Sequence, residues 1–468
     1  MDKIKNPSLF FIDIPPKINP IKVVKSLHAN SHMPNRDNDT ITNVKKEAKF
    51  YEVVKIYSIL FYISRLFGFL PVRIISNKGA TRLEFKLKSA WFAYCVIITI
   101  LMYFALITYF LNREFNIDLG FQVFTRAAES DGFFQNRQAP TKSSTVLVID
   151  RAFQVMLPIY GFVNTTSVRI QINKFVRFVN TWSEISKHFD TAFGSDYAMN
   201  LNCLLQFKKG LSFVLIFTYC STLYKAVTYP GRMLTEEFAL FDIFLKFSFV
   251  AFVTTAFTIS TANTLLSLVT VWIFYREILH GIRTQYENGI RITDRHVNEW
   301  KSLIISVREQ VKIFEEISSI PELNDLFFFF VSSLCISYMA FSLVLENVEE
   351  SGAMIPYAVG GLVFSMARTY MKGSLAEVLK EEEQKIARFI VSMRPEGGQC
   401  FQEMERAGEH YIDSRARVEM QLISNMILTN PTQVTFGNVI VLNKKLLLSV
   451  CSNLASYLVV LLQFKRPA

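Results

Sequence analysis

Seven apolar stretches, each long enough to cross a bilayer, dominate this chain of 468 residues. A spanning α-helix needs about 20 mainly apolar residues. Hydrophobic residues make up 51% of the chain, which is more than a soluble domain of this length usually carries. The sequence therefore predicts an all-α polytopic membrane protein with seven transmembrane helices. The predicted spans are residues 90–111, 146–169, 211–229, 238–275, 325–346, 353–371 and 433–464.

Two of these stretches are longer than one crossing needs. We expect the fourth to continue out of the membrane as helix at its end near Tyr275. In the seventh, Asn443, Lys444 and Lys445 interrupt the apolar run, and two lysines are costly in the middle of a membrane. The last span is therefore predicted from Leu446 to Phe464, after a cytosolic piece.

The distribution of lysine and arginine predicts the orientation. The segments between spans fall into two alternating sets, and the set that includes the N-terminal 89 residues carries 36 lysines and arginines against 7 in the other. Because cytoplasmic segments are enriched in these residues, the N-terminus is predicted in the cytosol and the C-terminus outside. The net charge of +10 then reflects topology and attraction to the anionic inner leaflet. No nucleic-acid partner is predicted.

Two portions of the N-terminal part differ in composition. Residues 1–48 are rich in Lys, Asn and Asp and are predicted to form a flexible cytosolic arm. Residues 50–70 are aromatic and end before Pro71. They fit either an amphipathic helix at the membrane interface, which Lys55 and Arg65 favour, or a short span that would shift the topology. Both alternatives remain open from the sequence.

Three segments between predicted spans place apolar residues at helical spacing, residues 276–320, 376–393 and 411–428. They predict amphipathic helices outside the bilayer. Each apolar face must be buried, either in a core shared between subunits or by packing of these helices on each other.

Small or polar side chains share one face of the last predicted helix. Hydroxyl and amide groups are costly against hydrocarbon, so this face should meet protein or water. It fits a pore lining, and it equally fits close packing between helices. The residues of this face, three or four positions apart, are Ser449, Ser452 or Asn453, Ser456, Val460 and Gln463.

Motifs for catalysis and metal binding do not occur in the sequence. The six cysteines stand singly, without a CxxC pair. There is no HExxH, no Gly-rich phosphate loop and no GxSxG turn. The sequence thus predicts no enzyme, no metal and no cofactor.

The end of the last helix carries a resemblance to a known family. Ser456, Tyr457, five apolar residues, Gln463 and Phe464 are similar to the signature of the insect gustatory receptors, which is Thr-Tyr, five hydrophobic residues and Gln-Phe. Ser456 stands where the family usually has Thr, and it keeps the hydroxyl. Length, helix number and charge bias agree with the family over the whole chain. The ending resembles most the carbon dioxide receptor subfamily.

The resemblance implies a gustatory chemoreceptor in the plasma membrane of a sensory neuron, acting as a ligand-gated non-selective cation channel. The family works as homo- or hetero-tetramers of related subunits, embedded in membrane lipid and opened by a small-molecule tastant or a dissolved gas. Here the channel would be part of a carbon dioxide receptor heteromer. Gating by a sugar or a bitter compound is the alternative within the family, and a secondary transporter or an auxiliary membrane subunit is the alternative outside it.

The resemblance also assigns roles to parts of this sequence. It implies a flexible arm (1–48), ligand-binding helices one to six with cytosolic extensions (49–371), cytosolic anchor helices that join subunits (372–445), and a pore-lining helix with a short external tail (446–468). Tyr457 and Phe464 would pack the pore helix against its neighbours. The implied pore lining is Ser449, Ser452, Ser456, Val459, Val460 and Gln463.

The ligand pocket of the family lies among helices two to six, in the outer half of the membrane. Ionisable groups inside spans are functional candidates, whereas those near helix ends reach water by extending along the helix. Gln154 and Lys246 lie deeper than the others. The ligand-binding candidates at this depth are Gln154, Arg151, Tyr224, Lys246, Tyr338 and Tyr357.

Overall fold

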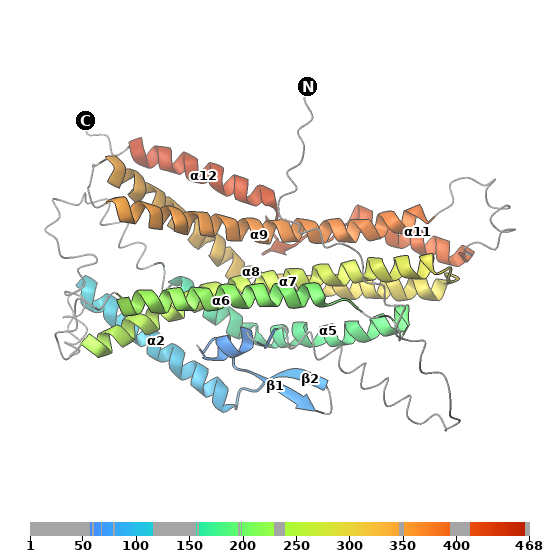
Figure 1. Ribbon diagram of the computed structural model, residues 1–468, viewed down its shortest axis with the longest axis horizontal. Helices are drawn as coiled ribbons and strands as arrows, with labels where there is room; N and C mark the ends of the chain where they lie inside the picture. Colours follow the sequence, from blue (N-terminus) through green and yellow to red (C-terminus); the bar gives the residue numbers. More distant parts are fainter. Residues whose placement is uncertain are drawn as a thin grey trace, which may run out of the picture. The chain divides into compact units, whose positions relative to one another are not determined.

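Figure 1 shows the computed structural model, which is helical over most of its described length. The backbone alone is described for residues 76–77, 80–81, 102, 105–115, 217–228, 239–254, 339–340, 342–345, 351–359, 361 and 461–462. The predicted flexible arm, residues 1–48, lies outside the description. The described residues are 57–58, 60–66, 68–77, 80–115, 156, 159–194, 197, 199–228, 239–345, 351–393 and 412–463.

The described elements are mainly helices, together with two small hairpins. A helix over residues 159–170 leads directly into α5. The labelled helices are α2 (Ala90–Phe115), α5 (Ile172–Phe193), α6 (Asn202–Thr228), α7 (Ala239–Glu287), α8 (Asp294–Leu345), α9 (Ser351–Ser392), α11 (Ser414–Thr429) and α12 (Lys444–Gln463). The hairpins are β1 (Val72–Asn77) with β2 (Ala80–Phe85) and β3 (Thr435–Phe436) with β4 (Ile440–Val441), both antiparallel.

Three of the helices are much longer than a bilayer crossing. α7 has 49 residues, as expected for a fourth span that continues as helix beyond Tyr275. α8, with 52 residues, joins an amphipathic segment and the fifth predicted span into one helix. Pro321 lies inside α8 without ending it, because the side chains on both sides of it, Ile317 and Glu322, are buried against neighbouring helices.

Within the described side chains, two helical segments are long and apolar enough to cross a membrane, Thr255–Glu287 and Asp294–Tyr338. Ala90–Leu101 is a shorter apolar helix at the start of the first predicted span. Residues 171–210, between the second and third predicted spans, contain α5 and the first turns of α6, so α6 begins before the predicted third span. The inside–outside orientation stays a prediction.

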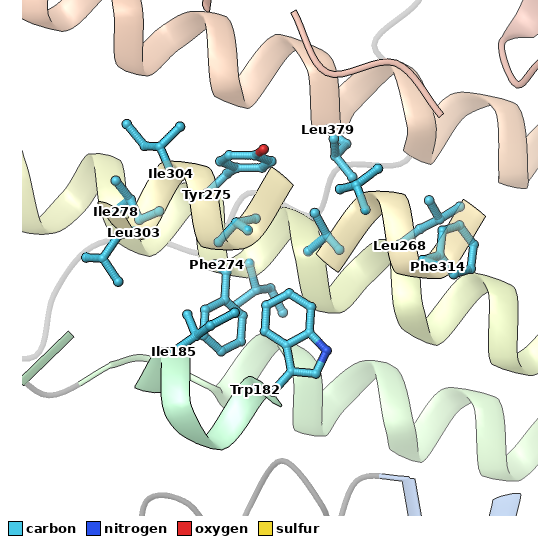
Figure 2. Packing of buried hydrophobic residues seen from close by; sticks show 14 of the residues in the cluster. Trp182, Ile185, Leu268, Phe274, Tyr275, Ile278, Leu303, Ile304, Phe314 and Leu379 are labelled. Atoms are coloured by element: carbon cyan, nitrogen blue, oxygen red, sulfur yellow. The ribbon is translucent and has the colours of Figure 1, made fainter. Parts of the chain in front are cut away.

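The core lies where α5, α7, α8 and α9 meet (Figure 2). Trp182 of α5 packs on Phe274 of α7 with their ring centroids 4.4 Å apart. Ile278 and Ile304, which the sequence placed on amphipathic faces, are fully buried in this core. The apolar faces of residues 276–320 thus pack against helices of the same chain, which is the second of the two alternatives.

A short helix from the aromatic stretch 50–70 packs on the same core. The hydroxyl groups of Tyr57 and Thr270 are 3.2 Å apart, and Phe61 meets Phe175 edge to face. Tyr62 and Leu66 on its other face are exposed. This geometry is that of an amphipathic helix.

Both hairpins were missed by the sequence reading. Asn180 of α5 holds β2 by accepting from the backbone N–H of Leu83 and donating to its carbonyl, each at 3.0 Å. The second hairpin occupies residues 435–441, which were predicted as the beginning of the seventh apolar stretch. Gly437 and Asn438 adopt positive φ angles there, which breaks helical continuity. Val434 and Phe436 are apolar because they are buried in the core, not because they face lipid.

Trp300 provides a test of this core. It is fully buried, and its indole N–H donates to Gln285, whose amide donates in turn to the carbonyl of Ala192. Trp300→Ala should lower the free energy of unfolding by about 3–5 kcal/mol, because it leaves a cavity and an unpaired amide oxygen. Ile305→Ala, at an exposed site of the same helix, is the control and should change it little. Thermal unfolding in detergent measures both, and equal melting temperatures would contradict this packing.

Candidate functional site

The last helix, α12, exposes many of its side chains. All six residues that the sequence assigned to a pore lining lie on it and are exposed. The hydroxyl of Ser456 donates to the Ser452 carbonyl within the helix. Tyr457 meets Phe330 of α8 edge to face, with centroids 5.8 Å apart, and remains 56% exposed. α12 contacts α8 and α9 of its own chain and leaves its polar face uncovered. Phe464 lies outside the described residues.

The beginning of α12 is attached tightly to α9. Asn443 caps the helix by accepting from the backbone N–H of Leu446 at 2.9 Å. Glu377 of α9 accepts from the backbone N–H of Lys444 at 3.0 Å and forms an ion pair with its ammonium at 3.0 Å. A Cβ on Gly373 would lie 2.7 Å from the Asn443 carbonyl oxygen. Glycine at 373 is what allows the two backbones to approach this closely.

The charges at this junction support each other. Burial by itself would raise the pKa of Glu377, but its hydrogen bonds to Lys444 outweigh this and hold the pKa below its ordinary value. The hydrogen bond to Glu377 raises the pKa of Lys444. Because the carboxylate pKa is lowered on folding, this contact stabilises the folded chain above the ordinary carboxylate pKa and is lost as the pH falls through the lowered one.

A second carboxylate holds the segment that leads into β3. Glu383 of α9 is fully buried and pairs with Arg308 of α8 at 2.6 Å. It also accepts from the backbone N–H of Thr432 at 2.6 Å and from the hydroxyl of Tyr275 at 3.3 Å. Arg308 reaches further to the carbonyl of Asn430 at 2.8 Å. The path from α11 to α12 is thus tied to α7, α8 and α9.

Four charged side chains are buried together between α8 and α9. The ammonium of Lys372 lies 2.8 Å from both carboxylate oxygens of Glu322 and 2.9 Å from Asp325. Arg368 lies 3.4 Å from Asp325, and all four side chains are at most 4% exposed. Two negative and two positive groups make the cluster neutral, which limits the cost of removing them from water.

Polar groups from other helices complete this cluster. Thr264 of α7 donates to Glu322 at 2.5 Å, and Arg368 donates to Thr261 at 2.9 Å. The hydroxyl of Tyr160, in the 159–170 helix, donates to Asp325. The guanidinium carbon of Arg368 also lies 3.6 Å from the centre of the Phe257 ring. Four separate helices therefore depend on one set of ionic contacts.

This cluster was not predicted from the sequence, although the spacing of its charged residues indicates it. Glu322 and Asp325 are three residues apart at the start of the fifth predicted span, and Arg368 and Lys372 are four apart at the end of the sixth. Opposite charges thus stand at the same predicted depth on neighbouring helices. The ligand-binding candidates from sequence were polar groups in the outer half of the membrane, whereas these four residues lie at the predicted cytosolic ends of their spans.

The predicted ligand-binding residues are described only in part. Tyr338 is buried on α8. Tyr224, Lys246 and Tyr357 lie on the described backbones of α6, α7 and α9, without described side chains. Gln154 and Arg151 lie outside the described residues. These assignments stay predictions.

Comparison with known proteins defines the class. Residues 133–466 match the family described as 7tm Chemosensory receptor, and the chain therefore belongs to this family. No curated protein sequence matches it. The insect olfactory receptor OR5 from Machilis hrabei in complex with eugenol superposes with a TM-score of 0.63 at 14% identity, covering 89% of this chain and 100% of that one. A second structure of OR5 from Machilis hrabei superposes with the same TM-score and coverage at 13% identity. At this identity the likeness shows the fold.

The recognition from the C-terminal residues is thus confirmed at the level of the chemosensory receptor family, and the predicted all-α membrane fold is confirmed with it. The resemblance to carbon dioxide receptors stays a prediction.

The buried cluster yields a test by double mutation. Glu322→Gln and Lys372→Met alone should each destabilise the fold by about 3–5 kcal/mol, since each leaves a buried charge without its partner. The double variant should cost clearly less than the sum of the two. The exposed pair of Lys174 and Glu316, at 2.6 Å, is the control and should contribute at most about 1 kcal/mol. Thermal unfolding of the wild type and the six variants of the two cycles measures the coupling. Additive effects at Glu322 and Lys372 would show that the pair is not coupled.

Gly373→Ala tests the attachment of α12. The added methyl group overlaps the Asn443 backbone, so this variant should lose about 1–3 kcal/mol and expose residues 440–446 to faster hydrogen exchange. Gly360→Ala, in the same helix, meets nothing within 4 Å and should leave exchange in 440–446 unchanged. Exchange measured by mass spectrometry reports on both. If the two variants are alike, the close approach of α9 and α12 does not matter for stability.

Proposed function

We propose that the chain is a subunit of a gustatory, ligand-gated, non-selective cation channel in the plasma membrane of a sensory neuron. The observation that carries the proposal is the state of α12. Its base is held by Glu377, Gly373 and the β3–β4 segment, while its hydroxyl and amide groups are exposed along one face. A membrane helix with an uncovered polar face needs water or further subunits beside it. A central pore lined by α12 from several subunits supplies both.

The proposed assembly is a homo- or hetero-tetramer, as the resemblance implies. In each subunit the N-terminus is cytosolic and the C-terminus external, and residues 372–445 belong to the cytosolic anchor. Ser449, Ser452, Ser456, Val459 and Val460 line the pore, with the amides of Gln463 near its outer end. A ring of such amides offers carbonyl oxygens to a passing cation. Tyr457 packs on Phe330 and fixes the rotation of the helix, and we extend the packing role to Phe464.

The ligand is proposed to be a small tastant or dissolved carbon dioxide, bound among helices two to six. Residues 49–371 supply the pocket, with Gln154, Arg151, Tyr224, Lys246, Tyr338 and Tyr357 as its candidates. OR5 from Machilis hrabei was solved with eugenol, a small organic molecule, which supports a ligand of this size for the present fold. Sugars and bitter compounds are tested alongside carbon dioxide.

Gln463→Ala tests the role of the pore. In cells that express the chain with related subunits, whole-cell currents evoked by dissolved carbon dioxide, sugars or bitter compounds should change in conductance or basal leak by about two- to tenfold, the range expected for losing one or two hydrogen bonds per subunit. Gln421→Ala, an exposed amide on α11, is the control and should leave the current as it is. If Gln463→Ala, like the control, gave the same agonist current as the unmodified chain, Gln463 would not line the pore. Surface-expressed protein without current in every combination would favour an auxiliary subunit or a transporter.

A further inference from the structure

Two arginines lie near the start of α2, and neither has an acidic partner among the described residues. Arg169, at the end of the 159–170 helix, donates to the carbonyls of Gly68 and Cys95 and to the hydroxyl of Thr99. Arg65 donates to the carbonyl of Val72. Among the residues that the structure describes, no carboxylate lies within ion-pair distance of either guanidinium group. Both positive charges are balanced by neutral dipoles alone.

The two guanidinium groups keep donors for a further acceptor. Their hydrogen bonds run through the Nη2 atoms, which leaves the Nη1 groups as donors. Both Nε atoms are buried without a hydrogen-bond partner, so the described chain compensates the charge of each guanidinium group incompletely. An arginine Nη1 group forms charge-assisted hydrogen bonds to phosphate oxygens. The chemistry of the pair is therefore that of an anion site.

Aromatic side chains surround Arg65 on the exposed side. Its guanidinium carbon lies 4.6 Å from the centre of the Trp91 ring and 6.0 Å from that of Tyr62. Tyr94 packs edge to face on Trp91 and donates to the Leu66 carbonyl. Trp and Tyr of this kind gather where the membrane interior meets the headgroups.

An apolar stripe continues from Trp91 along α2. Ile97, Leu101 and Phe104 follow at helical spacing, and each is more than half exposed. A soluble anion has no use for such a surface. A phosphate that carries an acyl chain can place that chain along the stripe, because residues 90–111 are the first predicted span and lie in the hydrocarbon.

We propose that Arg65 and Arg169 bind the phosphate of an anionic inner-leaflet phospholipid, whose acyl chain lies along the Trp91–Phe104 stripe of α2. The placement at the inner leaflet rests on the proposed orientation, in which residue 90 begins the first span on the cytosolic side and residue 169 ends the second there. Gly68 serves the site by adopting a φ of +75°, with Cβ room limited to 3.2 Å by Ile98, so that its carbonyl reaches Arg169. The lipid would join the short helix 57–66, α2 and the 159–170 helix.

The test is native mass spectrometry of the purified full-length protein with three probes. Phosphatidylserine should remain bound, whereas phosphatidylcholine and glycerophosphoserine, the same headgroup without acyl chains, should not. Arg65→Gln should reduce retention of phosphatidylserine by about tenfold, the effect of losing one charge-assisted contact. Arg82→Gln, an exposed arginine of β2, is the control and should retain the lipid.

Three outcomes would overturn the proposal. Equal retention of phosphatidylcholine would show that the negative headgroup is not recognised, and equal retention of glycerophosphoserine would show a site for soluble anions. Retention unchanged in Arg65→Gln would place the lipid elsewhere. Arg65 has one hydrogen bond within the described chain, so this variant is expected to fold even if Arg169→Gln does not, and its melting temperature checks this. The measurement requires no ion conduction. The lipid proposal can therefore be wrong while the channel function is right, and the channel function can be wrong while the lipid binds.

Discussion

The packing of the long extensions of α7, α8 and α9 on α5 is the interaction on which the other features depend. Trp182, Phe274 and Trp300 lie in this core, and the burial of their large rings stabilises the packing of these helices. Because α8 and α9 are held here, Arg308, Glu377 and Glu383 present their charges at fixed positions. The hairpin β3–β4 and the base of α12 are placed by these charges, so the geometry of the candidate pore begins in this core.

The contacts between α8 and α9 change in kind along the two helices. Toward one end the contacts are apolar and close-packed, and near residues 322–325 and 368–372 they are ionic and neutral overall. Such a cluster contributes little net stability, but it penalises any displacement that separates its charges. It thereby specifies the register between α7, α8, α9 and the 159–170 helix. α12 contacts α8 and α9, so a change in the register of these two helices would displace the base of α12.

The predictions from sequence succeeded where one physical rule acted alone. Hydrophobic length predicted the helices, and the 3.6-residue period selected the buried face of 276–320, from Ile278 to Ile317. Residues 433–442 were predicted as a cytosolic piece before the last span, but the hairpin there, in which Val434 and Phe436 are buried, was not predicted. At Glu322, Asp325, Arg368 and Lys372 the charges were visible, but their pairing depends on how two separate helices align, which spacing within one helix does not give.

The sequence by itself determined the class of the protein, since apolar length sets the number of spans and the residues around Tyr457 and Gln463 carry the family signature. The tertiary structure decided which faces meet. It showed that the amphipathic segments cover one another inside a single chain and that Glu377 and Gly373 hold the base of α12. It also placed Arg65 and Arg169 near the start of α2, with no carboxylate in ion-pair distance among the described residues. The reason is that periodicity along a chain fixes the side of a helix on which a residue lies, whereas its partner is set by long-range packing.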